Sequence, residues 1–391
     1  MKPFDLAVLL APTLLIGALT YLVTMRVTRN AATAAAAAVI KAGLFVAYFG
    51  LFFDGTYTFL DDISYLEGGA ELLQDGVGVV NLSTQWDLVL AIGRGEHFLY
   101  YLYNAYAFRL FGEGYFAPVA CNVLLTVAVA FFGMRLARTE LKLPRHQARW
   151  LYVFLLLHPD ILAWSTVPNG KDILTLLMHV LLLQAAAFFL RGKWSKAFLL
   201  GTPVCVVLTF LRFYVPFMFV AALVLGSIIT RHERGYTLRV ALGVVLLGAA
   251  IVGLGGQLDY AFDVLSDTLV NPLYGFVRVL MTPIPFNTEE AFAFLNIPAL
   301  IHWLLLPFLA IGLGTLWRIR TPFTRFFIVY TLLFLCLYAL VGELQGPRHR
   351  VQLDYAIALL QFVGLLTAAR RLHLGKVTQR PRERMSTVRA A

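Results

Sequence analysis

Long apolar stretches, separated by short polar ones, run along most of the chain. Segments 6–23 and 34–53 each approach or exceed the roughly 18 apolar residues that cross a hydrocarbon core about 30 Å thick. Within lipid only helices and closed barrels satisfy their own backbone, and these stretches do not alternate as barrel strands do. The pattern therefore predicts an all-α bundle with about eleven spanning helices, near residues 5–24, 31–53, 116–137, 148–165, 171–190, 197–212, 214–230, 237–256, 297–317, 323–341 and 352–369.

Composition and charge support the same fold and set the direction of the helices. The 391 residues are 60% hydrophobic and 14% charged, with a mean hydropathy of +0.76, so lipid is the solvent. If residues 25–30 are cytoplasmic, the positive-inside rule is obeyed by every other short basic loop, at 135–149, 191–196, 231–239 and 318–325. Most acidic residues then lie on the outer side. The net charge of +10 reflects this topology, and we do not expect nucleic acid as a partner.

Two outer segments, residues 54–115 and 257–296, are long enough to hold structure of their own. Within the first, residues 65–73 and 97–111 mix polar, apolar and aromatic positions at helical spacing. We expect juxtamembrane helices there, lying in the membrane interface. No repeat or linker divides the chain, so residues 1–369 are predicted to form one membrane domain, followed by a basic, disordered cytoplasmic tail at 370–391.

One charge and three thiols lie inside predicted helices. Lys41 would be costly against lipid, so we expect it to face the bundle or to extend toward the interface. Cys121, Cys205 and Cys336 have neither the spacing of a disulfide framework nor that of a metal site. We expect these cysteines to be packing residues.

The strongest candidate for chemistry is the adjacent pair Asp61 and Asp62, just beyond the second predicted helix. Two carboxylates side by side near lipid repel, so at least one needs a cationic, hydrogen-bonding or metal partner, or a raised pKa. An acidic N-cap of a juxtamembrane helix explains the pair equally well from the motif alone. The two interpretations are compatible, because a cap could also hold the pair in place.

Cations on the outer side form the second set of candidates. Lys171 lies in a Pro-Asn-Gly turn, where the following Asp172 is explained as a helix cap. Arg348 and Arg350 flank His349 at the start of the last helix, a pattern suited to phosphate because guanidinium groups bind its oxygens in pairs. Snorkelling at the interface is the alternative explanation for these arginines.

Three further residues carry less weight. Arg212 and Arg278 lie near aromatic residues and each, taken alone, is typical of an interface anchor. His158, followed by Pro159 and Asp160, fits either bundle packing or a site. The sequence contains no Gly-rich nucleotide loop, no zinc-protease motif and no serine-hydrolase motif, so a soluble nucleotide donor has no support.

Taken in order, these features resemble the GT-C superfamily of multi-spanning glycosyltransferases, which use polyprenyl-phosphate-linked sugars. Asp61-Asp62 with Tyr65 is similar to the acidic first outer loop of that family, and His97 to Tyr101 is similar to the helix that follows it. His158-Pro159 through Lys171-Asp172, and then Gly346 to Arg350, are similar to later landmarks. The resemblance spans most of the chain.

The resemblance implies sugar transfer at the outer membrane surface from a polyprenyl-(di)phosphate donor to an acceptor hydroxyl. Asp61 would be the general base and Asp62 would orient the acceptor, as the two catalytic residues. Arg348, Arg350, Lys171 and Arg212 would bind the donor phosphate. Five more residues are candidates for substrate contacts: Tyr65, His97, Tyr101, His349 and Arg278.

The resemblance leaves the cofactor and the acceptor open. Metal use varies in the superfamily, so a divalent metal is open, and the sequence offers no complete set of metal ligands. The acidic loop follows the second helix instead of the first, and no large soluble C-terminal domain is present. We therefore expect a lipid-linked glycan or another lipid as acceptor, in the inner membrane of a bacterium.

Three other functions fit the same pattern. An envelope-polysaccharide polymerase of the O-antigen type also joins lipid-linked sugars outside the membrane. A lipid-glycan flippase or transporter should instead place charges along a path at the membrane midplane, where Lys41 is the one clear charge in a helix. A non-catalytic membrane scaffold is the third alternative.

Overall fold

Helices make up the fold, and the computed structural model describes residues 3–78, 80–93, 97–229, 236–253 and 269–378. Over these residues no strand occurs, apart from an isolated bridge between Leu269 and Val341. The α-helices are α1 (Leu6–Thr28), α2 (Ala31–Ala47), α3 (Leu60–Gln74), α4 (Trp86–Ile92), α5 (Phe98–Phe111), α6 (Phe116–Glu140), α7 (Arg145–Leu156), α8 (Pro159–Thr166), α9 (Asp172–Leu190), α10 (Trp194–Leu211), α11 (Tyr214–Ile229), α12 (Tyr236–Gly253), α14 (Pro272–Met281), α15 (Asn296–Arg318), α16 (Pro322–Leu340), α17 (Pro347–Arg350) and α18 (Asp354–Thr378). A π-helical turn, η1 (Tyr48–Phe52), extends α2, and 3-10 turns are η2 (Glu290–Leu295), η3 (Gly342–Gln345) and η4 (Val351–Leu353).

Eight helical stretches of the described chain are long and apolar enough to cross a membrane, which makes this a polytopic helical membrane protein. They cover Leu6–Thr28, Ala31–Phe52, Phe116–Glu140, Asp172–Leu190, Trp194–Leu211, Glu290–Arg318, Pro322–Leu340 and Pro347–Arg371. Of the eleven predicted spans, 214–230 is the shorter helix α11. The predicted helix 237–256 is α12 as far as Gly253, and its last residues lie outside the described part.

The predicted single helix at 148–165 is wrong in one respect, because the chain breaks there into α7 and α8. Pro159 is the first residue of α8. It has no backbone N–H to continue the helical hydrogen bonds, and its ring disfavours a helical conformation of the residue before it. His158 accordingly has extended backbone angles, with φ −61° and ψ 127°. The break turns His158 and Asp160 into the interior of the bundle, where both are buried.

Close helix packing in the centre depends on glycine. A Cβ atom at Gly312 of α15 would collide with the carbonyl of Leu360 in α18, and one at Gly364 would collide with the carbonyl of Phe308. Small residues that let two backbones approach are the usual basis of helix association in lipid. These contacts place α18 in the middle of the bundle, buried along most of its first half.

Lys41 of α2 faces the bundle. Its side chain is buried, and its ammonium donates a hydrogen bond of 2.5 Å to the hydroxyl of Thr126 on α6. This polar contact replaces water at that depth, which is the condition for a charge-bearing residue inside a span.

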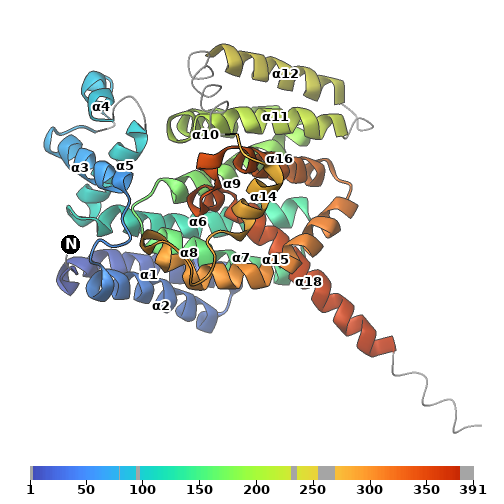
Figure 1. Cartoon of the computed structure of the whole chain (residues 1–391), viewed down its shortest axis with the longest axis horizontal. Helices are drawn as coiled ribbons and strands as arrows, with labels where there is room; N and C mark the ends of the chain where they lie inside the picture. Colours follow the sequence, from blue (N-terminus) through green and yellow to red (C-terminus); the bar gives the residue numbers. More distant parts are fainter. Residues whose placement is uncertain (1–2, 79, 94–96, 230–235, 254–268, 379–391) are drawn as a thin grey trace, which may run out of the picture.

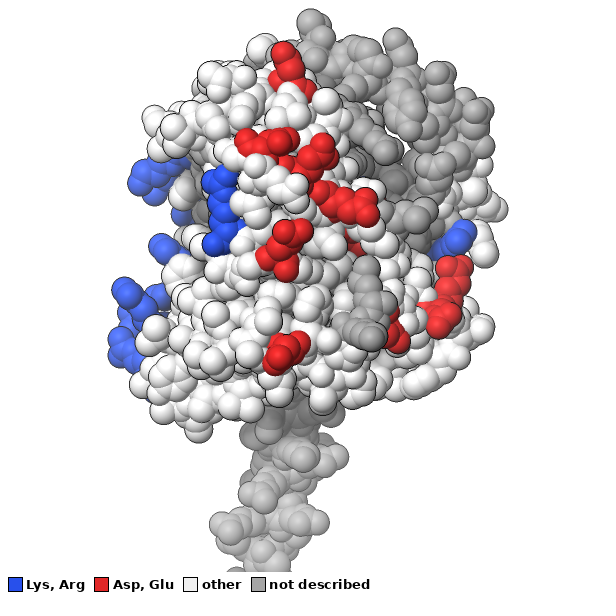
Figure 2. Space-filling model, turned by 90° about the vertical axis from the view of Figure 1, so that its left-hand side faces the viewer, with Lys and Arg blue, Asp and Glu red and all other residues white. Residues whose placement is uncertain are grey.

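The two ends of the bundle differ in structure. Helices α3, α4 and α5 lie together at one end, where α9 and α17 begin and α10 ends, and we call this the site end (Figure 1). The juxtamembrane helices predicted at 65–73 and 97–111 are parts of α3 and α5. In the view of this end, acidic side chains predominate (Figure 2). Exposed carboxylates there are Asp54, Glu67, Glu71, Asp75, Asp87 and Glu113.

The opposite end, which we call the basic end, contains the termini of α6, α9 and α15, with the basic residues Arg138, Arg191 and Arg318. The last helix runs out beyond this end (Figure 1). Residues 370–378 of the predicted tail are helical, as the end of α18, and 379–391 lie outside the described residues. Likewise, 257–268 of the predicted second outer segment lie outside them, whereas α14 and η2 occupy the rest.

Candidate functional site

Asp62 starts the first helix of the site end. Its carboxylate accepts hydrogen bonds from the Phe59 backbone N–H at 2.6 Å and from the Tyr115 hydroxyl at 2.5 Å. A carboxylate at this position also interacts favourably with the positive end of the helix dipole. Asp62 is buried, and burial raises its pKa to about 6. Asp62 therefore caps the N-terminus of α3. Its neighbour Asp61 contacts Arg348 instead.

A buried network of amide and phenol side chains fixes the turn before α9. It joins the turn to α5 and α6 and, through Tyr115, to Asp62 of α3. Asn169 is its centre. The Asn169 backbone N–H donates to the Tyr115 hydroxyl at 2.9 Å, and its side-chain amide donates to Asn104 at 2.8 Å and accepts from Tyr100 at 3.0 Å. Asn122 completes the network by donating to the carbonyl of Gly170 at 3.2 Å. Buried polar groups satisfied in this way hold Lys171 and Asp172 in a defined position.

A chain of ion pairs then joins four residues that are far apart in sequence. The guanidinium of Arg348 binds both oxygens of Asp61, with contacts of 2.9 and 2.7 Å, and its Nε donates to Asp172 at 3.0 Å. The other oxygen of Asp172 accepts from Arg212 at 2.9 Å. Asp172 is buried, whereas the side chain of Asp61 is 42% exposed. Paired contacts of this type fix both distance and plane.

Lys171 adds an amine without a carboxylate partner among the described residues to this cluster. It is buried, and its ammonium lies 5.7 Å from the centre of the Tyr65 ring. No carboxylate of the described residues lies within ion-pair distance of it. Burial and the nearby charges of Arg212 and Arg348 lower the pKa of Lys171 to about 6. We define the site cluster as Asp61, Lys171, Asp172, Arg212 and Arg348.

The site cluster offers several hydrogen-bond donors to an anion. Two carboxylates face two guanidinium groups and one amine, so a protonated Lys171 leaves the cluster with net positive charge. Two buried donors also lack a partner among the described residues, the Tyr65 hydroxyl and Nε of Arg212. A phosphate brings negative charge and several acceptor oxygens, which these unpaired donors require.

Asp61 is ionised in this setting. Burial opposes its charge, but the hydrogen bonds and positive charge of Arg348 outweigh burial and hold the pKa of its carboxyl below the ordinary value. A carboxylate that is paired with arginine is a poor base until the arginine finds another partner. An anion bound to Arg348 would supply that partner.

The five predicted substrate-contact residues lie in three places. Tyr65, His97 and Tyr101 are together: the ring of Tyr65 lies 6.4 Å from His97 and 5.2 Å from Tyr101. His349 lies 3.5 Å from a guanidinium nitrogen of Arg212. Burial lowers the pKa of His97 to about 4, so it is neutral at pH 7. Arg278, by contrast, is exposed on α14.

Arg350 does not lie with Arg348. It is buried on the opposite side of α17, where its guanidinium donates to the carbonyls of Leu280 and Thr282 and lies 3.6 Å from Asp160. The Arg-His-Arg pattern predicts that both arginines bind one phosphate, and the structure places them apart. The helical geometry of α17 explains the difference, because residues two apart point about 200° away from each other.

Asp160 and Arg350 belong to a second group of polar residues inside the bundle. His158 contacts the side-chain oxygen of Gln361 at 3.0 Å, and His302 lies 3.6 Å from Asp160. Neither oxygen of Asp354 has a hydrogen-bond partner among the described residues. This group, His158, Asp160, His302, Arg350, Asp354 and Gln361, is the buried polar group.

Aromatic side chains lie beside the guanidinium of Arg348. The Arg348 guanidinium lies 5.9 Å from the Phe59 ring, which is 5.2 Å from Phe292 and stacks on Trp164 at 6.4 Å. In the described part of the chain no three His, Cys, Asp or Glu side chains are grouped as metal ligands. The groups at the site are two carboxylates, two guanidinium groups, one amine and the faces of aromatic rings.

Several residues of the site were missed or misjudged from the sequence. Asp172 was expected as a helix cap, but its carboxylate joins two arginines. Asn169 and Tyr115, which position the turn, gave no signal beyond their polar side chains in an apolar chain. The position of Asp172 directly after Lys171, at the start of an apolar helix, was the only pointer available.

No protein-family model, no curated protein and no solved structure matches the chain.

Proposed function

We propose that the protein is a glycosyltransferase that moves a sugar from a polyprenyl-phosphate donor to an acceptor hydroxyl at the site end. The observation that carries the proposal is the bidentate pair of Asp61 and Arg348, a part-exposed carboxylate held by a cation of an anion-receiving cluster. The resemblance to the GT-C superfamily adds the donor class. In this proposal the site end faces outward from a bacterial inner membrane, for assembly of an envelope glycan or glycolipid.

The reaction follows from the exchange of partners at Arg348. The donor phosphate takes the guanidinium of Arg348, together with Lys171 and Arg212, and Asp61 is released. Asp61 accepts the proton of the acceptor hydroxyl while the new bond forms between the acceptor oxygen and the anomeric carbon. The bond from that carbon to the phosphate oxygen breaks with inversion, and the cations stabilise the negative charge of the departing polyprenyl phosphate.

The test is sugar transfer by purified protein, with a panel of polyprenyl-phosphate hexoses and pentoses as donors. Asp61→Asn keeps the size of the side chain and removes the base, so kcat should fall by about 10²–10⁴-fold. Glu71→Gln is the control, since Glu71 is an exposed carboxylate of the same helix. Full activity of Asp61→Asn would remove the proposed base. Products of increasing length would favour the polymerase.

A transporter for lipid-linked glycans is the second candidate. The buried polar group favours it, because ionisable residues inside a membrane bundle are the usual components of a transport path. Headgroup translocation in liposomes with no glycosylated product would favour the transporter over the transferase.

A further inference from the structure

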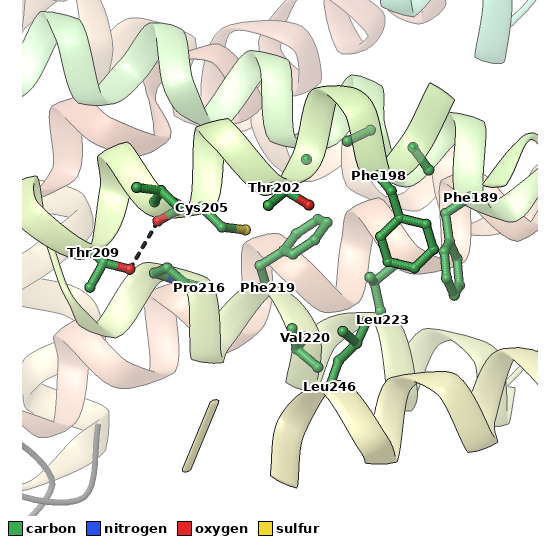
Figure 3. Close-up of a pocket in the computed structure, with 14 residues that line it drawn as sticks. Phe189, Phe198, Thr202, Cys205, Thr209, Pro216, Phe219, Val220, Leu223 and Leu246 are labelled. Carbon is green, nitrogen blue, oxygen red and sulfur yellow. Dashed lines mark hydrogen bonds between the residues drawn. The ribbon is translucent and has the colours of Figure 1, made fainter. Parts of the chain in front are cut away.

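An apolar cavity of about 300 Å³ lies between α10 and α11. Phe198, Cys205 and Thr209 of α10 form one wall, and Pro216 and Phe219 of α11 form the other (Figure 3). Leu246 of α12 lies at its edge, and Phe189 of α9 at its inner end. The cavity therefore lies along the length of two helices, and not at the surface of the site end.

The walls of the cavity are almost entirely apolar, with the side chains of Thr202, Cys205 and Thr209 as the exceptions. The hydroxyl of Thr209 donates to the Cys205 carbonyl of its own helix at 2.9 Å, as Figure 3 shows. No lining residue has a buried polar side-chain atom that lacks a hydrogen-bond partner among the described residues. A polar ligand would lose its hydration without compensation, whereas a hydrocarbon chain would gain contacts.

One end of the cavity lies next to the site cluster. Thr209 and Pro216 line the cavity within four residues of Arg212, which joins α10 to α11. From Thr209 the cavity extends to Phe198, about 16 Å along α10 at 1.5 Å per residue. That length is about half of a hydrocarbon core. An amphiphile with its anion at Arg212 could thus extend its chain directly into the cavity.

We propose that this cavity binds the isoprenoid chain of a polyprenyl phosphate, with the phosphate at Arg212 and Lys171. The positive charge at the outer end of the cavity complements the phosphate, and the apolar walls complement the chain. The choice of a polyprenyl phosphate over other anionic lipids rests on the proposed function. A single chain is favoured because the cavity is one groove between two helices.

The experiment is photo-crosslinking in phosphatidylcholine vesicles with a polyprenyl phosphate that carries a diazirine in its chain. Crosslinked peptides should come mainly from residues 194–223. A polyprenol of the same length and a diazirine phosphatidylglycerol are the comparison probes. Both should crosslink at least fivefold less at these residues. Equal crosslinking by the polyprenol would overturn the proposal, because the phosphate would then have no influence, and equal crosslinking by the phosphatidylglycerol would show that any anionic lipid fills the cavity.

Two matched variants test the position of the chain. Cys205→Trp fills the cavity, and crosslinking should fall at least fivefold. Cys336→Trp introduces the same residue at an exposed cysteine of α16 and should leave crosslinking unchanged. Thr202→Trp is a second filling variant at an exposed lining position, in case Cys205→Trp does not fold. Crosslinks spread over all lipid-facing helices, and equal in every variant, would identify ordinary surrounding lipid.

The result is independent of catalysis, because crosslinking needs no turnover. Crosslinking in the cavity without any sugar transfer would support the lipid site and reject the proposed function. Sugar transfer that depends on Asp61, without crosslinking between α10 and α11, would support the function and reject this cavity.

Discussion

Asp172 bonds two arginines with one carboxylate. Its two oxygens are divided between Arg212 and Arg348, and its side chain is buried. A buried charge is tolerable only with such partners. Asp172 therefore determines where both arginines point, and indirectly where Asp61 is held.

Asp172→Asn tests this positioning role. The variant removes the buried charge that two part-buried guanidinium groups share, so the free energy of unfolding should fall by about 3–5 kcal/mol. Chemical unfolding in detergent measures the change. Asp87→Asn, at an exposed position of α4, should shift stability by no more than about 0.5 kcal/mol. Equal stability of the two variants would show that Asp172 does not hold Arg212 and Arg348 in position.

Lys171 makes donor binding depend on pH. With a pKa of about 6 it is mostly neutral at pH 8 and gains a proton as the pH falls. A phosphodiester donor prefers the protonated amine, so its affinity should rise as pH falls toward 6, by up to about tenfold per pH unit, and then level off.

The measurement is the Kd of a polyprenyl-phosphate sugar between pH 5 and 8. Asp62 titrates in the same range, with a pKa of about 6, so a variant is needed to separate the two. Lys171→Met should abolish most of the slope. A slope that persists in Lys171→Met would assign the pH dependence to another group.

The short helix α17 directs its two arginines to different parts of the molecule. Arg348 on one face reaches the site cluster, and Arg350 on the other face reaches Asp160 and the carbonyls at the end of α14. The motif Arg-His-Arg thus combines one residue of the site with one residue that holds α14 against α17.

Arg350→Met tests this division. Removal of the guanidinium leaves His302 as the remaining neighbour of Asp160 at ion-pair distance among the described residues, so the protein should lose about 3–5 kcal/mol of stability. The KM for the donor should stay unchanged, because Arg350 does not face the phosphate. Arg348→Met should do the reverse and raise the KM of the donor. A rise in the KM of the donor for Arg350→Met, with normal stability, would indicate that Arg350 binds the phosphate after all.

Sequence patterns predicted the helices far better than the contacts between them. Apolar length alone located α1, α2, α6, α9, α15 and α16, because lipid imposes that length. The break between α7 and α8 was missed, although Pro159 was visible, because proline inside a span can also produce only a kink. The ion pair of Asp61 with Arg348 joins residues 287 positions apart, and no local pattern contains that distance.

On the scale of the whole molecule, charge separates the two ends. Exposed carboxylates gather at the site end, and the termini of the helices at the basic end contain arginine. By the positive-inside rule, we propose that the site end lies outside the cell. The proposed donor and acceptor would both meet the enzyme on that side.

Cysteine labelling tests the orientation. In a variant whose native cysteines are replaced by alanine, Glu71→Cys places a thiol at the site end, and Lys193→Cys places one at the basic end. A membrane-impermeant maleimide should label Glu71→Cys in intact spheroplasts and Lys193→Cys only after the membrane is opened. Labelling of Lys193→Cys in intact spheroplasts would show that the orientation is the reverse of the proposed one, with the site end in the cytoplasm.

The most direct measurement is a structure of the protein with a bound polyprenyl-phosphate sugar. We predict that the phosphate lies within hydrogen-bond distance of Arg348, Lys171 and Arg212, with Asp61 released from Arg348 and facing the acceptor side. A phosphate bound elsewhere, with the pair of Asp61 and Arg348 intact, would contradict it.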